Sequence, residues 1–188
     1  MKLTCGEQLP DFVYDTPFAQ NCQFAEQFRQ ADESVVIYFL RYYGCTLCQL
    51  DLQELAAAYP QIRSKCAKLF VVLQSEPEAL KKQLAEKPLP FDIICDPKQR
   101  LYRQFEIGAA ANKAGLADMR TVKKLLRAKL SGLRHGAYEG NELQLPALVI
   151  ADAYGKIVYV HYAKSAGDIP DAGQLLGLLE QVQVSRPA

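Results

Sequence analysis

The amino-acid sequence predicts an α/β fold in which helices flank a mixed central β-sheet. Two apolar, β-branched runs, SVVIYFL at 34–40 and KLFVVLQ at 68–74, have the composition of strands that are buried on both faces. A segment with a helical pattern follows each run, and the chain closes with a β-hairpin and a final helix. This order of elements is typical of an α/β sandwich.

The remaining elements are expected in the same order along the chain. A helix should begin at about Thr46, and a second should follow Ser75, whose hydroxyl suits an N-cap. The other expected elements are a strand at 91–96, a short helix within 97–108 that Gly108 ends, a hairpin of strands at 146–152 and 156–162, and a helix at 171–184.

Length and composition predict one domain over residues 1–188. The 188 residues are 49% hydrophobic and carry a formal net charge of +1, which favours neither nucleic acid nor a membrane as a partner. The first residues contain no apolar h-region, and no apolar run is long enough to span a bilayer. We therefore expect a cytoplasmic protein, in which the six cysteines serve some purpose other than structural disulfides.

The segment at about 109–144 does not belong to the minimal α/β pattern and predicts a helical insertion before the hairpin. Apolar residues recur in it at helical spacing, and we expect them to face the protein while the basic residues face solvent. The apolar positions are Met119, Val122, Leu126, Leu130 and Leu133; the basic ones are Arg120, Lys123, Lys124, Arg127, Lys129 and Arg134. A solvated outer face is the simplest interpretation. The alternatives are a surface for a partner or an anionic ligand, or weak membrane contact.

Cys45 and Cys48 lie where the first strand gives way to a helix. A helix N-terminus lowers the pKa of a thiol, and a separation of three residues brings both sulfurs within disulfide reach. Gly44 permits a tight entry into the helix, and Arg41 adds positive charge nearby. The pair is thus a candidate redox centre. The alternatives are a zinc site, for which the remaining cysteines and histidines are too scattered, and two inert buried thiols.

Three segments resemble the peroxiredoxin-like branch of the alkyl hydroperoxide reductase and thiol-specific antioxidant (AhpC/TSA) superfamily. They are FLRYYGCTLCQLDLQEL, PFDIICDPKQRLYRQFEIG and GKIVYVHYAKSAGDIP, within residues 34 to 182. The resemblance implies a thioredoxin-like fold and thiol-based redox chemistry without a cofactor or metal. It also implies that Pro146, at the head of the penultimate strand, follows a cis peptide bond beside the cysteine pair. Pro146, Arg41 and Gly44 are the substrate-binding positions that this placement predicts.

The sequence departs from the peroxiredoxin pattern at two places. Aligning the Pro-x-x-x-Thr-x-x-Cys motif on Cys48 puts Arg41 at the proline and Cys45 at the threonine. The arginine that peroxiredoxins carry near the start of the later strand is also missing, since that neighbourhood reads LQLPALVI. Thioredoxins proper carry Trp-Cys-Gly-Pro-Cys, whereas this chain has no tryptophan and has Thr-Leu between its cysteines. The second cysteine and Pro146 nevertheless favour the thioredoxin style of chemistry.

Three functions follow as hypotheses. The first is a thiol–disulfide oxidoreductase in which Cys45 attacks a protein or small-molecule disulfide, Cys48 resolves the mixed disulfide, and an external thiol reductant restores the pair. The second is a peroxidase in which Cys48 attacks the peroxide and Cys45 resolves. The third is a non-catalytic binding module with the basic helix as its surface. A homodimer through that helix is expected if its apolar stripe is exposed.

Overall fold

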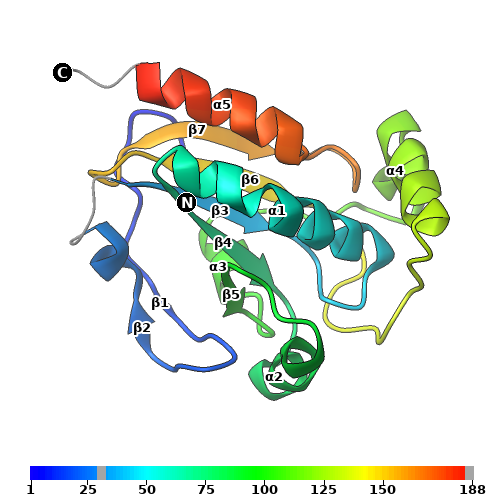
Figure 1. Cartoon of the computed structure of the whole chain (residues 1–188). Coiled ribbons are helices and arrows are strands. Elements are labelled where there is room, and N and C mark those ends of the chain that lie inside the picture. Colours follow the sequence, from blue (N-terminus) through cyan, green and yellow to red (C-terminus); the bar gives the residue numbers. More distant parts are fainter. Residues whose placement is uncertain (29–32, 185–188) are drawn as a thin grey trace.

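The computed structural model describes residues 1–28 and 33–184 (Figure 1), so the predicted range 1–188 extends beyond the described residues. The strands are β1 (Val13–Tyr14), β2 (Cys22–Gln23), β3 (Ser34–Phe39), β4 (Ala67–Leu73), β5 (Asp92–Cys95), β6 (Ala147–Ala151) and β7 (Ile157–Tyr162). The α-helices are α1 (Thr46–Ser64), α2 (Pro77–Glu86), α3 (Arg100–Gln104), α4 (Met119–Leu130) and α5 (Ala172–Val184). Short 3-10 helices cover Phe24–Phe28 and Ala114–Leu116.

The central sheet is mixed, as the sequence predicts. Its strand order is β5-β4-β3-β6-β7, with β3, β4 and β5 parallel and with β6 and β7 antiparallel to their neighbours. All six residues of β3 are buried, which explains why its sequence is a continuous apolar run rather than an alternating one. The hairpin that joins β6 to β7 forms the antiparallel side of the sheet.

Two apolar cores cover the two faces of the sheet (Figure 1). One core lies between the sheet and the helices α1, α2 and α5, and it contains both Cys45 and Cys48. The other core contains the buried residues of α3 and an aromatic cluster from the N-terminal segment, in which Phe12 stacks on Phe24 at 4.4 Å. The redox candidate residues therefore lie at the end of the central strand, on the face that α1 covers.

The carboxyl end of β3 is held in place by hydrogen bonds from neighbouring elements. The Tyr102 hydroxyl, from α3, donates to the carbonyl oxygens of Leu40 and, at 3.0 Å, of Val72. One residue further along the chain, the Arg41 carbonyl accepts a hydrogen bond from the backbone N–H of Gln74 at 2.8 Å. The segment that leads from β3 into the cysteine pair is thus fixed by backbone as well as by packing.

Two of the expected helix boundaries are wrong. The N-cap of α2 is Glu76, because the Ser75 hydroxyl bonds to Tyr43 and Glu139 instead of to the first turn of the helix. The short helix α3 ends at Gln104, so Gly108 does not terminate it. At Ser75 tertiary hydrogen bonds replace the predicted helix cap, and α3 ends before the chain reaches the predicted terminating glycine.

The predicted orientation of the inserted helix is also wrong. The face of α4 that packs on the protein carries Lys124 and Ala128, which are 8% and 0% exposed, while the apolar stripe faces outward. The reason is electrostatic: the Lys124 ammonium lies 2.6 Å from the carboxylate of Asp51, a buried acid on α1. A buried charge requires a partner, so this ion pair fixes which side of α4 meets α1.

We expect Lys124→Met to lower the free energy of unfolding by about 3–5 kcal/mol, because it leaves the Asp51 carboxylate buried without its partner. The double variant Asp51→Asn with Lys124→Met should recover most of that loss. The matched control is Arg127→Met, which removes an ion pair with Glu54 in which the arginine is 56% exposed; it should lose less than about 1 kcal/mol. Urea unfolding measures all three, and equal losses for Lys124→Met and Arg127→Met would contradict the account.

Candidate functional site

Cys45 is the N-cap residue of α1, as predicted. Its backbone is extended (φ −67°, ψ 124°), and its sulfur accepts a hydrogen bond from the backbone N–H of Cys48 at 3.5 Å. Cys48 follows in the first turn, and its thiol bonds to the Cys45 sulfur. Both cysteines are free thiols in this structure, and the geometry places the two side chains together.

Arg41 contacts both cysteines. Its guanidinium donates from Nη2 to the Cys45 sulfur at 2.9 Å, and its backbone N–H donates to the Cys48 sulfur at 3.4 Å. The second guanidinium nitrogen, Nη1, donates to the carbonyl oxygen of Glu142 at 2.8 Å, which fixes the direction of the side chain. Arg41 therefore supplies a positive charge at the sulfur of the N-cap cysteine.

The surroundings of the two sulfurs push their pKa values in opposite directions. The hydrogen bond from Cys48, the charge of Arg41 and the backbone N–H groups of the first turn lower the pKa of Cys45 to about 6, although burial opposes them. Burial, followed by the hydrogen bond to Cys45, raises the pKa of Cys48 well above its ordinary value. Cys45 is thus the thiolate at neutral pH and Cys48 the thiol.

A segment without regular secondary structure, residues 134–142, covers the cysteine pair; we call it the strap. The backbone N–H of Gly136 donates to the Gly44 carbonyl at 2.8 Å, and the Gln49 side chain donates to the Arg134 carbonyl at 2.9 Å. Cys45 is 1% exposed and Cys48 is 4% exposed. Neither thiol is therefore open to solvent while the strap is in place.

Side chains from the loops after β3 and β4 hold the strap at several points that the sequence did not indicate. The Tyr42 hydroxyl lies 3.1 Å from Nε2 of His135, whose ring stacks on Tyr138 at 4.1 Å. Further along, Ser75 donates to the carboxylate of Glu139. These residues come from distant parts of the chain, and only the glycines of the strap could have signalled a close approach.

Gly44 occupies its position for a different reason from the one predicted. Its φ is not positive, so the helix entry does not require glycine. Instead, a Cβ atom at Gly44 would overlap the backbone oxygen and nitrogen of Ala137. Gly44 is the point at which the strap rests on the loop before α1.

The prediction of a cis peptide bond before Pro146 is wrong. The bond is trans, and Pro146 begins the antiparallel side of the sheet with its carbonyl accepting from the N–H of Ala163 at 3.1 Å. The residues before it are held in an extended path by the Gln144 side chain, which donates to the carbonyl oxygens of Gly108 and Leu145 at 2.8 and 3.1 Å. This extended path fits a trans peptide bond before Pro146.

The other cysteines do not share this environment. Burial raises the pKa of Cys95 to about 12 and, with nearby carboxylates, raises that of Cys22. Cys5 and Cys66 are exposed, and Cys66 has a left-handed backbone (φ +50°) in the turn before β4. Within residues 1–28 and 33–184, no group of three or more histidine, cysteine or acidic side chains is arranged to hold a metal ion.

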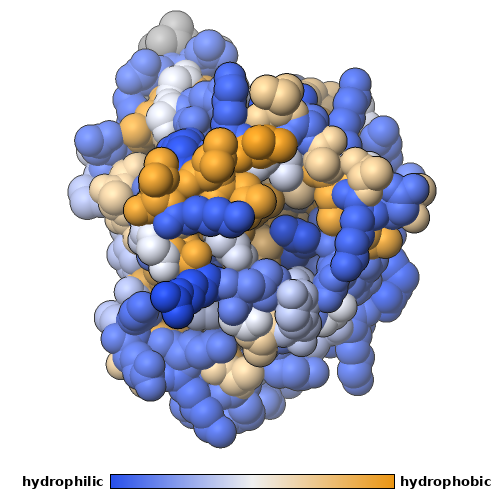
Figure 2. Space-filling view, turned by 90° about the vertical axis from the view of Figure 1, so that its right-hand side faces the viewer, coloured by the Kyte–Doolittle hydropathy of each residue, from blue (hydrophilic) through white to orange (hydrophobic). Residues whose placement is uncertain are grey.

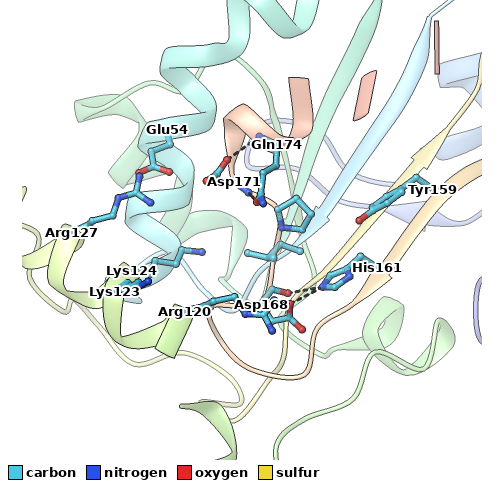
Figure 3. Close-up of a pocket in the computed structure, with 13 residues that line it drawn as sticks. Glu54, Arg120, Lys123, Lys124, Arg127, Tyr159, His161, Asp168, Asp171 and Gln174 are labelled. Carbon is cyan, nitrogen blue, oxygen red and sulfur yellow. Dashed lines mark hydrogen bonds and ion pairs between the residues drawn. The ribbon is translucent and has the colours of Figure 1, made fainter. Parts of the chain in front are cut away.

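A separate charged pocket of about 400 Å³ lies between α4, β7 and the start of α5 (Figure 3). His161, from the segment that resembles the family, lies 3.3 Å from the Asp168 carboxylate, and Arg120 lies 2.6 Å from the same group. Lys124 and Arg127 reach the pocket from α4 but are paired with acids of α1. Its basic groups are thus largely neutralised, and neither Cys45 nor Cys48 lines it.

Two sequence comparisons identify proteins that are similar to this chain. The model of the AhpC/TSA family matches residues 5–160. A prostamide/prostaglandin F synthase of Salmo salar is 26% identical over 159 residues, which cover 81% of this chain and 78% of that protein.

Solved structures share the fold at low sequence identity. A yeast mitochondrial 1-Cys peroxiredoxin matches 97% of this chain and 78% of its own, with a TM-score of 0.70 and 14% identity. The bacterioferritin comigratory protein of Xanthomonas campestris matches 95% of this chain and 99% of its own, with a TM-score of 0.66 and 16% identity. A putative thiol:disulfide interchange protein DsbE from Chlorobium tepidum matches 97% of this chain and 98% of its own, with a TM-score of 0.60 and 17% identity. The fold is thioredoxin-like, as the resemblance implied.

We expect the alkylation rate of Cys45 to rise with pH through a midpoint of about 6, because only the thiolate reacts. The hydrogen bond from Cys48 and the charge of Arg41 outweigh the effect of burial on the pKa of this sulfur. Cys48→Ala removes the hydrogen bond and should raise the midpoint; Arg41→Met removes the charge and should also raise it. Iodoacetamide labelling against pH, followed by peptide mass spectrometry, measures each midpoint, with exposed Cys66 as an internal control. Midpoints that stay at the wild-type value in both variants would refute this view of the site.

Proposed function

The chain belongs to the AhpC/TSA family and has the thiol-dependent oxidoreductase or peroxidase function of that family, and from this premise we propose a division of labour between its two cysteines. Cys45 is the attacking thiolate and Cys48 the resolving thiol of a thiol–disulfide oxidoreductase. The observation that carries the proposal is the contact of 2.9 Å between the Arg41 guanidinium and the Cys45 sulfur at the helix N-cap. No comparable cation reaches the sulfur of Cys48 from a side chain in the described structure.

In the first step, the Cys45 thiolate attacks one sulfur of a substrate disulfide. A bond forms between the Cys45 sulfur and that substrate sulfur, the substrate S–S bond breaks, and the second substrate sulfur leaves as a thiolate. Arg41 loses its anionic partner at Cys45 and remains beside the reacting sulfurs. The product of this step is a mixed disulfide on the N-cap residue.

In the second step, Cys48 resolves the mixed disulfide. Once Cys45 is bonded to substrate, it no longer accepts the Cys48 hydrogen bond or carries the negative charge, and both of these raise the pKa of Cys48 in the free enzyme. The Cys48 thiol therefore becomes easier to deprotonate, and the leaving substrate thiolate is a base that accepts its proton. Cys48 then attacks the Cys45 sulfur, releasing the second substrate thiol and leaving a Cys45–Cys48 disulfide.

The cycle closes when an external thiol reductant supplies two electrons to the Cys45–Cys48 disulfide. The yeast mitochondrial 1-Cys peroxiredoxin resolves its thiol via the glutathione and thioredoxin systems. We propose a reductant of the same chemical class for this chain. Substrate and reductant both approach the Cys45 sulfur, so both require the strap to move away from the 1% exposed side chain.

A peroxide is the second candidate substrate, favoured by the peroxiredoxin neighbours and by the position of Arg41. In this reaction the Cys45 thiolate attacks one peroxide oxygen, the O–O bond breaks, and the other oxygen takes a proton and leaves as an alcohol or water. Cys45 becomes a sulfenic acid, which condenses with the Cys48 thiol to form the disulfide and release one further water. Arg41 then supplies the guanidinium that the later strand lacks. The low pKa of Cys45 favours it over Cys48 as the attacker here too, in contrast to the alignment with the peroxiredoxin motif.

We expect Cys45→Ser to abolish turnover with both substrate classes. With the disulfide substrate, Cys48→Ser should stop after one turnover because the mixed disulfide is not resolved. The chromogenic disulfide of 2-nitro-5-thiobenzoate and cumene hydroperoxide serve as probes, with stopped-flow detection of the first turnover. Cys66→Ser, which alters an exposed cysteine outside the site, is the matched control and should behave like the wild type. Turnover of either probe by Cys45→Ser would contradict the proposal, and inactivity of the wild type with both would favour a binding module.

A further inference from the structure

The outward face of α4 is apolar. Its side chains recur at helical spacing and are well exposed: Met119 is 70% exposed, Val122 46%, Leu126 56% and Leu130 88%. Figure 2, which looks at the side of the molecule that carries α4, shows a gathering of apolar side chains bordered by hydrophilic ones. The buried residues of the helix, Lys124 and Ala128, lie on its opposite face, so the stripe does not contribute to the protein's own core.

The charges on α4 and on the segment that follows it are basic. From Met119 to Tyr138 the sequence contains no acidic residue, but it contains Arg120, Lys123, Lys124, Arg127, Lys129 and Arg134. Three of these are matched by acids elsewhere in the fold: Arg120 by Asp118 and Asp168, Lys124 by Asp51, and Arg127 by Glu54. Among the ion pairs of the described residues, none involves Lys123, Lys129 or Arg134.

These charges decide what can cover the stripe. A second copy of the chain, docked symmetrically through the same face, would bring the same unmatched cations together. The helix also stands out at the edge of the molecule (Figure 1), and the apolar side chains of its stripe are exposed. An apolar stripe with cations along its border is the pattern of a helix that lies in a membrane interface.

We propose that α4 docks on the surface of an anionic lipid membrane. The four apolar side chains of the stripe enter the boundary between headgroups and acyl chains, and Lys123, Lys129 and Arg134 lie against the anionic headgroups. The helix has 12 residues and lies along the surface, and no helix in the described parts of the chain is long and apolar enough to cross a bilayer. This proposal departs from the expectation that the protein has no membrane partner, which rested on the net charge of +1 and on the lack of a membrane-spanning run.

Docking also has a consequence for the redox site, because the strap follows α4 directly in the chain. Arg134, at the start of the strap, accepts a hydrogen bond from Gln49 of α1 through its carbonyl, and Gly136 rests on Gly44. The strap therefore links a docked α4 to the loop and helix that carry the cysteine pair. The docking itself does not depend on which reaction the cysteines carry out.

Vesicle flotation tests the proposal with the full chain. We expect the protein to float with vesicles of phosphatidylcholine that contain about one third phosphatidylserine, and not with phosphatidylcholine alone; raising the salt from about 0.1 M to about 0.5 M should release it. Leu126→Glu and Lys129→Glu should each weaken binding on the order of tenfold or more. Both positions are exposed, so neither change disturbs the core. Phe18→Glu, at a residue that is 71% exposed elsewhere on the surface, is the matched control and should bind like the wild type.

Four results would overturn the proposal. They are the absence of flotation with anionic vesicles, equal flotation with neutral vesicles, wild-type binding by Leu126→Glu, and loss of binding in Phe18→Glu. Analytical ultracentrifugation distinguishes the rival occupant: a dimer that Leu126→Glu dissociates, together with no flotation, would assign the stripe to a second copy of the chain.

Discussion

The chemistry of this fold depends on the contact between the Arg41 guanidinium and the Cys45 sulfur. A thiol buried to 1% exposure is expected to hold its proton, since burial penalises the charged form. At Cys45 the hydrogen bond from Cys48, the arginine charge and the helix N-terminus outweigh that penalty, and the pKa falls to about 6. The same arrangement leaves Cys48 protonated, so the two sulfurs differ in role although they lie one turn apart.

The parts of the fold around this contact hold Arg41 in place and exclude water. Tyr102 fixes the backbone just before Arg41, and the carbonyl of Glu142 in the strap fixes its guanidinium. Exclusion of water strengthens the attraction between the arginine and the thiolate, because the local dielectric constant falls. The strap that provides this exclusion also closes the route to Cys45. Activation of the thiolate and access of the substrate are therefore opposed, and the proposed reaction requires the strap to move away from Cys45.

Much of the fold and the location of the cysteine pair could be predicted from sequence, because strand burial and helix capping leave local patterns. The buried runs became β3 and β4, and Cys45 became the N-cap of α1. The orientation of α4 could not be predicted, because it depends on an acid 73 residues earlier in the chain, Asp51, which binds Lys124. The strap was not predicted for the same reason: its anchors, in the loops after β3 and β4, are long-range and polar. The trans bond at Pro146 was not predicted, because the expectation of a cis bond came from the family resemblance and not from the residues around Pro146.

The identity of the cysteine that first bonds to a substrate tests the central claim most directly. The wild-type protein, mixed with a small aromatic disulfide, is quenched in acid during the first turnover, and the mixed disulfide is located by peptide mass spectrometry without reduction. The account predicts the adduct on Cys45 at the earliest times, followed by its replacement with a Cys45–Cys48 disulfide. An adduct that appears first on Cys48 would contradict the role assigned to Arg41 and to the helix N-cap.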